Sequence, residues 1–289
     1  MTRQFFDFFM NDSDLNIPVN KLDSHRDQQP IAILVTGANG QLGLTIQELY
    51  AGNSTFDFTF TSKSELDITN KREIDIFFEK YKFDYCINCA AYTNVEQAEK
   101  TPALAYKVNA EAVKSLALVC KEYKTTLIHV STDYVFDGEK GTPYTIKDLP
   151  NPINEYGKSK LLGEQYIQEI LDHYFIVRTS WLYSKNYGKN FYKTILELAN
   201  TKKELAITTE QIGCPTNAES LAKAIIDLMV NKSIEYGVKH VSDDKVMTWY
   251  DFAKDILSEN KLNTKTKLVK TSNYVTFAKR PKNSILLNE

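Results

Sequence analysis

The sequence predicts an α/β fold: a doubly wound parallel sheet with a smaller lobe built from discontinuous segments. Two observations predict this class. Apolar, β-rich runs alternate with helical segments from residue 31 to about residue 178, as expected for strands that helices cover on both faces. A glycine-rich stretch also joins the first of these runs to the first helical segment, which is typical of sheets that bind nucleotides.

Size and charge limit the kinds of partner. The chain has 289 residues, 43% of them hydrophobic, which is enough to bury a full core. Lysine and arginine number 35 against 37 acidic residues, a net charge of −2. This balance indicates no nucleic acid and no membrane as a partner and favours a small molecule. The sequence shows neither an apolar run of about 18 residues nor the order of a signal peptide, so we expect a cytoplasmic protein.

The four cysteines do not suggest a disulfide framework in a chain of this length, which agrees with a reducing compartment. Cys86 and Cys89 form a C-x-x-C pattern inside a predicted buried strand, Tyr85 to Ala90. Residues three apart on a strand face opposite sides. We therefore interpret both as small apolar residues and predict no metal site, while a divalent cation between subunits is left open.

Residues 1–30 carry an aromatic cluster and then a polar stretch without sustained periodicity, and are interpreted as an extension outside the fold. The fold begins at Ile31–Thr36, and a helix is predicted from Leu44 to Tyr50. The intervening G-x-x-G-x-x-G stretch lets the backbone turn tightly and approach a pyrophosphate at the helix N-terminus. Its candidate residues are Gly37, Gly40, Gln41, Leu42 and Gly43.

The second predicted strand, Phe56 to Phe60, ends in Thr-Ser-Lys63. An acidic residue at this strand end binds the ribose of NAD in many such sheets. Because this strand end shows a lysine and no carboxylate, the sequence favours NADP(H), with NAD(H) left open. Leu66-Asp67-Ile68 is predicted to form a short third strand that presents Asp67 to the adenine.

The alternation continues with a helix at about 71–80, the strand 85–90, a long helix at about 103–123 and the strand 126–131. Ligands of such sheets bind outside the carboxyl ends of the strands. We therefore expect one group of residues beside the cofactor and another beside the reacting centre, whereas His129, inside its strand, is interpreted as a core histidine. The two groups are Ala91, Tyr92 and Thr93, and Ser131, Thr132 and Asp133.

The stretch 154–163 is predicted to be helical and sets Tyr156 four residues before Lys160, which places both side chains on one face. A phenol has a pKa of about 10, and a neighbouring ammonium is expected to lower it, so the pair can act as an acid/base unit. Alone, the pattern also fits a half-buried ring and a solvated lysine. The upstream motifs favour the acid/base interpretation.

These motifs, with Arg178-Thr-Ser-Trp181, Gln211 to Thr216, Trp249 to Phe252 and Arg280 to Ser284, follow one another as they do in a known family. The chain resembles the extended short-chain dehydrogenases/reductases with a Rossmann domain, and among them the reductases of dTDP-linked 4-keto-6-deoxy sugars. The resemblance spans Ile31 to the C-terminus. The N-terminal extension, Cys89 and Cys214 depart from it without touching the chemistry.

The resemblance implies reduction of the C4 ketone of dTDP-4-dehydro-6-deoxy-L-mannose to dTDP-L-rhamnose with NAD(P)H. Tyr156 would protonate the sugar oxygen, Lys160 would hold the nicotinamide ribose, and Thr132 would complete the catalytic set. The substrate would contact Thr132, Asp133, Trp181 and Asn190. The cofactor would contact Gly37, Gly40, Gln41, Leu42, Gly43, Lys63, Asp67, Ile68, Ala91, Tyr92, Thr93, Tyr156 and Lys160.

The predicted division places the NAD(P)-binding Rossmann domain at 31–178 and the substrate-binding lobe mainly at 179–289, with 218–243 packing back on the Rossmann domain. A homodimer is one expected assembly. Arg280 fits a structural ion pair and a phosphate contact equally well.

Other functions stay open from the sequence. One is a reductase or epimerase of another 4-keto nucleotide sugar; a dehydratase is disfavoured because no acidic pair stands beside Thr132. A different class is a non-catalytic nucleotide-binding subunit, since the fold also resembles the regulatory subunit of methionine adenosyltransferase. The intact set of Thr132, Tyr156 and Lys160 weighs against that class.

Overall fold

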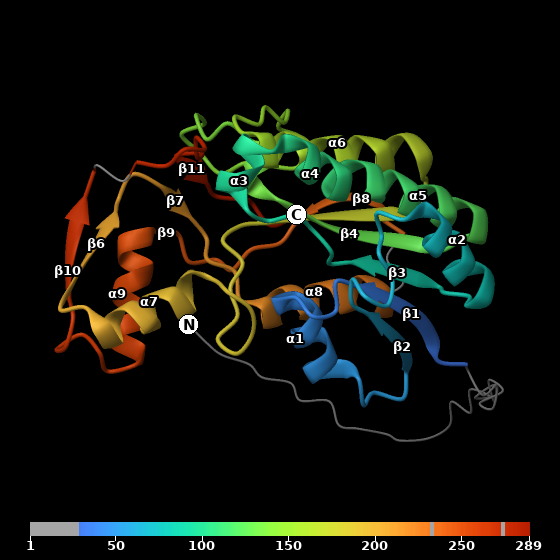
Figure 1. Ribbon diagram of the computed structural model, residues 1–289, viewed down its shortest axis with the longest axis horizontal. Coiled ribbons are helices and arrows are strands. Elements are labelled where there is room, and N and C mark those ends of the chain that lie inside the picture. Colours follow the sequence, from blue (N-terminus) through green and yellow to red (C-terminus); the bar gives the residue numbers. More distant parts are fainter. Residues whose placement is uncertain (1–28, 232–233, 273–274) are drawn as a thin grey trace, which may run out of the picture.

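The computed structural model describes residues 29–231, 234–272 and 275–289. The predicted extension, 1–30, therefore lies outside the described residues except for its last two positions. The described chain forms a large sheet between two layers of helices and a smaller lobe beside it (Figure 1). None of the described helices is long and apolar enough to cross a membrane.

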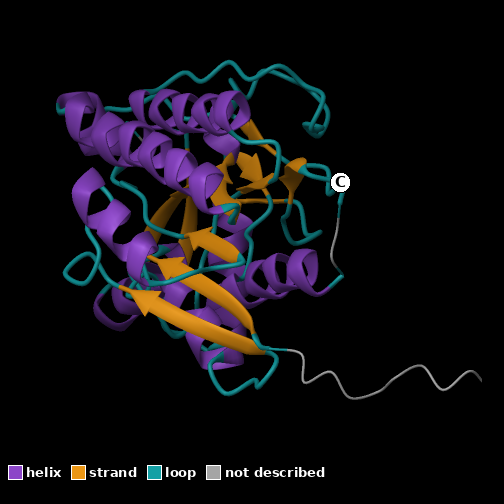
Figure 2. Ribbon diagram, turned by 90° about the vertical axis from the view of Figure 1, so that its right-hand side faces the viewer, coloured by secondary structure: helices purple, strands orange, loops and turns teal. Residues whose placement is uncertain are grey.

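The large sheet has six strands, all parallel, in the order β2-β1-β3-β4-β5-β8. The chain passes from β1 to β2 and then returns to the other side of β1 to form β3. The strand order thus reverses beside β1, and ligands of doubly wound sheets bind at such a point. Figure 2 shows the twist of the sheet. The strands are β1 (Ile31–Thr36), β2 (Phe56–Thr61), β3 (Tyr85–Asn88), β4 (Thr126–Thr132), β5 (Tyr174–Thr179) and β8 (Gly237–His240).

Each face of the sheet packs against its own helices in a separate apolar core. Phe78, Leu116 and Ile167 lie in one core, under α2 (Lys71–Lys80), α5 (Ala112–Tyr123) and α6 (Glu155–Ile170). Ile46 and Ile225 lie in the other, under α1 (Gln41–Tyr50) and α8 (Ala218–Val230). Helix α8 lies beside α1 and β8 extends the sheet, so 218–243 lies with the sheet although it follows part of the smaller lobe in sequence (Figure 1).

The connection from β3 to β4 is helical for most of its length. The predicted long helix at 103–123 is interrupted: α3 (Val95–Lys100) and α4 (Pro102–Tyr106) lead into a π-helical turn, η1 (Lys107–Glu111), before α5 begins. A π turn inserts an extra residue and re-aims the side chains around it. Asn109 in this turn is buried and bonds the loop after β3.

The smaller lobe has its own core, which includes Ile195, Phe252 and Ile256. Two parallel strands form one of its sheets and three short strands form another. Helix α9 begins with a capping box in which Thr248 and Asp251 bond each other's backbone N–H groups. The lobe contains α7 (Phe191–Thr201), β6 (Glu204–Thr208), β7 (Ile212–Gly213), β9 (Met247–Thr248), α9 (Trp249–Glu259), β10 (Lys267–Thr271) and β11 (Asn283–Ser284).

The prediction of a third strand at 66–68 is wrong, because this segment forms a turn. One carboxylate oxygen of Asp67 accepts hydrogen bonds from the Thr69 N–H and hydroxyl, both at 2.9 Å, and the Asp67 N–H donates to Glu73. These local bonds take the place of a strand ladder. Helix α1 also begins at Gln41, three residues before the predicted start.

The cysteines are free thiols among the described residues. Cys86 lies in the core under α2 and α5, whereas Cys89, just after β3, packs against the opposite core. The two side chains therefore face opposite sides of the sheet, as expected. In the part of the chain that the structure describes, no group of three or more metal-ligating side chains is found.

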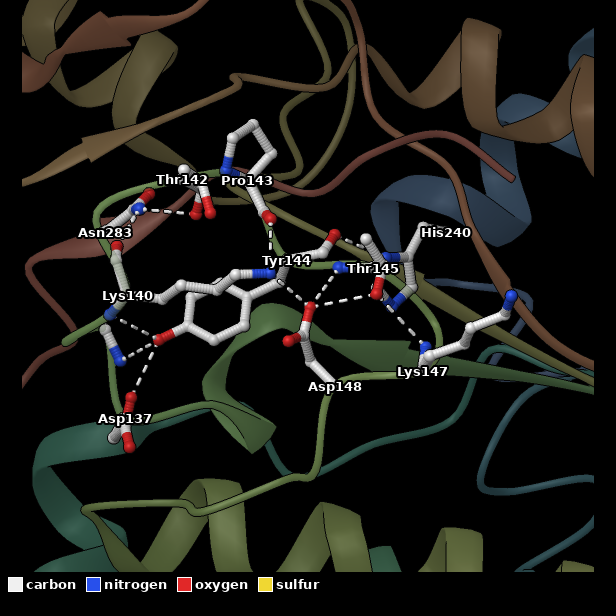
Figure 3. Close-up of polar contacts among 11 residues, drawn as sticks. Asp137, Lys140, Thr142, Pro143, Tyr144, Thr145, Lys147, Asp148, His240 and Asn283 are labelled. Carbon is white, nitrogen blue, oxygen red and sulfur yellow. Dashed lines mark hydrogen bonds and ion pairs between the residues drawn. The ribbon is translucent and has the colours of Figure 1, made fainter.

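The connection from β4 to α6 is held by a polar cluster around Tyr144 (Figure 3). The Tyr144 hydroxyl donates to Asp137 at 2.7 Å and accepts from the Gly138 and Lys140 N–H groups. Lys140 pairs with Asp148 at 2.6 Å. The C-terminal segment joins the cluster because Asn283 donates to the Lys140 carbonyl oxygen. This ordered connection fixes where the chain enters α6.

Candidate active site

Two adjoining cavities open at the carboxyl ends of the strands. The larger, about 610 Å³, lies over β4 and α6, and the smaller, about 400 Å³, lies over the ends of β1 and β2. Gly40, Cys89 and Ala91 line both cavities. Every residue that the sequence proposes for the site lines one or both of them, with the exception of Asn190.

Glycines shape the floor between the cavities. Gly37 has φ +67°, and a Cβ there would lie 2.6 Å from the Ala90 nitrogen; a Cβ on Gly43 would lie 2.6 Å from the Ala38 Cα. Neither position tolerates a side chain. No side chain caps the start of α1 at Gly40, so its first-turn N–H groups can serve an anionic ligand.

The smaller cavity is bordered by the end of β2. Lys63 lines it, with a side chain that is 83% exposed and an Nζ 4.0 Å from Asp67. The expectation that no carboxylate lies at this strand end is wrong. Glu65 folds back to accept the Ser62 N–H at 2.8 Å and the Ser62 hydroxyl at 2.7 Å. Glu65 was not expected at this strand end because it stands four residues after the strand in the sequence.

The loop 91–93 borders both cavities and is fixed by Asn109 from the π turn. The Asn109 Oδ1 accepts the Tyr92 N–H at 2.8 Å, and its Nδ2 donates to the Tyr92 carbonyl oxygen and the Ser159 hydroxyl, both at 3.0 Å. A Cβ on Gly163 would lie only 2.1 Å from the Asn109 carbonyl oxygen. Helix α6 thus approaches η1 closely enough to tie its own Ser159 to this loop.

Thr132 and Tyr156 approach each other from β4 and α6. The Thr132 hydroxyl donates to Asp133 Oδ1 at 3.0 Å and accepts the Tyr134 N–H at 3.2 Å. Next to Tyr156, Gly157 allows a close approach, because a Cβ there would lie 2.1 Å from the Tyr134 carbonyl oxygen. The Tyr134 and Tyr156 rings meet edge to face, with centroids 5.7 Å apart.

The electrostatics of Tyr156 differ from the sequence expectation. Burial raises its pKa. The expected lowering by Lys160 is wrong for this arrangement, because the Lys160 Nζ donates to the Val130 carbonyl oxygen at 2.6 Å and lies 3.1 Å from His129 Nε2. Burial lowers the pKa of Lys160 to about 8. Tyr156 is therefore a protonated phenol at neutral pH.

Asp133 lines the larger cavity. The residue is 3% exposed, and burial raises its pKa to about 6. Its Oδ2 is buried and forms no hydrogen bond with the described residues. A buried acceptor of this kind usually has a partner, and a hydroxyl group is a suitable donor.

Two tryptophans form one wall of the larger cavity. The Trp181 and Trp249 rings stack with centroids 3.5 Å apart and an interplanar angle of 5°. Trp181 has φ +47°, unusual for a residue with a side chain, and its ring packs where a Cβ on Gly213 would lie 2.6 Å away. Trp249 is held by a hydrogen bond to Gln211 at 2.8 Å. Its place beside Trp181 was not foreseen.

Asn190 has a structural role in this arrangement. Its Oδ1 caps α7, and its Nδ2 donates to the Ser184 carbonyl oxygen at 2.8 Å and to Gln41 Oε1 at 3.1 Å. Gln41 in turn donates to the Leu182 carbonyl oxygen. These bonds fasten the loop 184–190 to the glycine-rich turn and place Lys189 at the larger cavity, a contact that the sequence did not indicate.

Arg280 forms an ion pair with Glu96 at 2.8 Å, and it also lines the larger cavity. Its Nε is buried and makes no hydrogen bond with the described residues. Glu96 also accepts the N–H groups of Phe277 and Ala278, which fastens the C-terminal segment beside the site. The structure therefore shows Arg280 in the ion pair that was one of the two predicted roles. Its Nε–H group is still available as a donor.

A parallel sheet with a glycine-rich first turn, and a Thr-Tyr-Lys set at its carboxyl edge, defines the class of extended short-chain dehydrogenases/reductases. Within that class, the family model for the RmlD substrate binding domain matches residues 31–289. The chain belongs to this family.

Relatives and solved structures agree with this assignment. The dTDP-4-dehydrorhamnose reductase of Aggregatibacter actinomycetemcomitans is 39% identical over 264 residues, 88% of this chain and 90% of that protein. The enzyme of the same name from Escherichia coli is 37% identical and covers 89% of each. The crystal structure of dTDP-4-dehydrorhamnose reductase from Bacillus anthracis in complex with NADP has a TM-score of 0.86 at 38% identity, covering 90% of this chain and 91% of that one.

Proposed function

We propose that this protein reduces the C4 ketone of dTDP-4-dehydro-6-deoxy-L-mannose to dTDP-L-rhamnose, with NADPH as the preferred donor and NADH as the second. One observation carries the proposal: Thr132, Tyr156 and Lys160 line a single cavity that continues onto the glycine-rich turn. The names of the relatives and the NADP bound to one of them support it.

The residues present suit a dinucleotide. The first turn of α1, from Gly40 to Gly43, would hold the diphosphate, Lys63 the 2′-phosphate, and Lys160 the nicotinamide ribose. The cradle supports this fit, because side chains at Gly37 and Gly43 would fill it. When bound, the nicotinamide supplies the hydride.

The proposed chemistry of the protein is the delivery of one proton. Reduction of a ketone builds negative charge on its oxygen, and Tyr156, protonated at neutral pH, would give its hydroxyl proton to that oxygen. Thr132 lines the same cavity as Tyr156 and would orient the phenol. Positioned proton transfer of this kind typically contributes about 10² to 10⁴ in rate.

The proposed sugar contacts come from two sides of the cavity. Asp133 Oδ2, buried and without a partner among the described residues, would accept a sugar hydroxyl. The aromatic face of Trp181, held flat by Trp249, would pack against the apolar face of the deoxysugar. A sugar lacking the 6-hydroxyl offers such an apolar face.

The deciding test follows the absorbance of reduced nicotinamide with purified protein, NADPH or NADH, and dTDP-4-dehydro-6-deoxy-L-mannose. Oxidation that requires the dTDP sugar supports the proposal, and its absence with intact cofactor binding contradicts it. Tyr156→Phe keeps the ring and removes the proton. We expect it to lower turnover by about 10² to 10⁴ with nearly unchanged cofactor affinity, and wild-type turnover would refute the acid role.

The cytoplasmic location and the homodimer stay predictions. Cys86 on β3 and Cys120 on α5 are both free thiols and lie in the same apolar core. Their reduced state supports a reducing compartment.

A further inference from the structure

The side chain of Lys160 ends against two residues of strand β4. Lys160 is 1% exposed, and its Nζ donates to the Val130 carbonyl oxygen and lies 3.1 Å from His129 Nε2. His129 is completely buried, and both of its ring nitrogens have polar neighbours. A core histidine in contact with Lys160 can influence the protonation of that lysine.

Hydrogen-bond accounting locates the proton of His129. Asn88 Oδ1 lies 2.7 Å from the Thr36 hydroxyl and 3.2 Å from the Ala90 nitrogen. The Ala90 N–H can only donate, so the amide oxygen must face it. Asn88 Nδ2 then faces His129 Nδ1 at 2.9 Å and donates to it. The neutral imidazole therefore carries its proton on Nε2.

That proton points at Lys160. An ammonium has three donors and no acceptor, so a charged lysine would place donor against donor at 3.1 Å. Burial lowers the pKa of His129 well below its usual range, which excludes an imidazolium at neutral pH. Only the neutral amine form can accept from His129 while donating to Val130, so His129 favours that form over the ammonium. With a pKa of about 8, both forms of Lys160 are populated at pH 8.

The other groups around Lys160 do not supply a free negative charge. Glu164, one turn along α6, forms an ion pair with Arg178 at 2.6 Å and also accepts the hydroxyl of Ser131. Cys89, at the end of β3, is a neutral thiol, because burial raises its pKa to about 12. Tyr156, one turn earlier, is a neutral phenol. Among the described residues, Lys160 forms no ion pair.

We propose that His129 is a positioning residue: it holds Lys160 against β4 and favours its neutral amine form, so that engagement of the cofactor ribose requires Lys160 to leave His129 and to be fully protonated. The identity of the ligand rests on the proposed function. The reaction involved is a protonation in which solvent supplies the proton and the amine lone pair accepts it. No redox step is part of the proposal.

The proposal has a definite sign. Burial lowers the pKa of Lys160 to about 8, and hydrogen bonds from an ammonium to ribose hydroxyls raise it. Cofactor binding then takes up a proton, about half a proton per site at pH 8. Affinity for the cofactor is greatest below pH 8 and falls as the pH rises above it.

The test is calorimetric titration of the full protein with NADPH at pH 8 in two buffers of different ionisation enthalpy, without the sugar. His129→Asn keeps an acceptor for Asn88 and removes the contact to Lys160, whereas His129→Gln restores an N–H toward Lys160. We expect uptake of about 0.5 proton in the wild type and in His129→Gln, and a smaller uptake in His129→Asn, where the N–H that disfavours the ammonium is gone. His173→Asn, at an exposed position, is the control and should match the wild type.

Equal uptake in the wild type and His129→Asn, or no uptake in the wild type, would overturn the proposal. Binding and uptake without turnover of the dTDP sugar would refute the proposed substrate and leave the inference standing. A second measurement needs no ligand: unfolding of the wild type and His129→Asn between pH 8 and 10.5.

The second measurement also has a predicted sign. Lys160 has a lower pKa folded than unfolded, so its contribution to stability is complete above about pH 10.5 and is lost as the pH falls toward 8. We expect a smaller dependence in His129→Asn, because the variant lacks the N–H that opposes protonation of Lys160. Identical slopes in the two proteins would refute the inference even if no cofactor binds.

Discussion

Gly157→Ala tests whether the close seating of α6 positions the acid. A Cβ at this position would lie 2.1 Å from the Tyr134 carbonyl oxygen, whereas ordinary contact begins at 3.4 Å. Helix α6 and the segment after β4 must therefore separate by about 1.3 Å. The clash is with backbone, which a side-chain rotation cannot relieve. Tyr156 sits on one side of this gap and Thr132 on the other.

The expected loss is large for one methyl group. A displacement of about 1 Å at a reacting geometry can cost about 10² in rate, so we expect kcat to fall about 100-fold. Overpacking should also destabilise the fold by about 1 to 3 kcal/mol. In an open helix the same substitution would stabilise by about 1 kcal/mol, so the sign of the stability change reports whether the contact is real.

The assay pairs steady-state turnover of NADPH and the dTDP sugar with chemical unfolding. Gly52→Ala is the matched control, because a Cβ there meets nothing within 4 Å and the backbone is unstrained; turnover should be unchanged. A Gly157→Ala protein that is more stable than the wild type and turns over normally would refute the seating argument. A stable protein with impaired turnover would support positioning alone.

Two further predictions concern charge at the cavities. Lys63→Ala should weaken NADPH by about tenfold or more and NADH little, since a charged contact to the 2′-phosphate is lost; equal losses by titration would remove the argument for NADPH. Asp133→Asn should stabilise the fold at pH 7.5 by up to about 3 kcal/mol, because the pKa of Asp133 is raised from 3.8 to about 6 and its ionisation costs folding free energy. That cost disappears below about pH 4, where the carboxyl is protonated in both states. Equal stabilisation by Asp133→Asn at pH 4 and pH 7.5 in unfolding experiments would contradict this prediction. The kcat/KM of the variant should fall at neutral pH.

The local part of the site could be predicted from the sequence. The glycine-rich turn and the pair Tyr156 and Lys160 are set by residues close together in the chain, and strand ends of a parallel sheet meet at one edge. Those rules placed Ala91 and Thr132 at the cavities without any coordinates. Each inference needed only the strand order and a helical period.

The missed features depend on contacts between distant segments. Trp249 reaches the cavity because the smaller lobe folds so that its ring stacks on Trp181. Lys189 reaches it because the hydrogen bond from Asn190 to Gln41 fastens its loop to the glycine-rich turn. The short run at 66–68 has strand-like residues, yet the Asp67 carboxylate bonds Thr69 and makes a turn. Side-chain bonds that compete with a ladder are not visible in an apolar pattern.

The environment of Lys160 could not be predicted from the sequence because it depends on the register of three strands. Thr36, Asn88 and His129 lie on three adjacent strands, and the register pairs Thr36 with Asn88 and Asn88 with His129. These pairs are separated by 52 and 41 residues in the chain. A slip of one residue would turn any of these side chains to the other face of the sheet, and the row that ends at Lys160 would be broken.

The protonation of Lys160 is therefore a property of the sheet interior as well as of the cavity. A substitution at Thr36 or Asn88 touches neither ligand, yet it would free His129 to change tautomer. With the proton on Nδ1, His129 Nε2 would accept from Lys160 and favour the ammonium, which reverses its influence. Substitutions in this row should consequently shift the pH dependence of cofactor binding, whereas apolar substitutions in the same core should change stability alone.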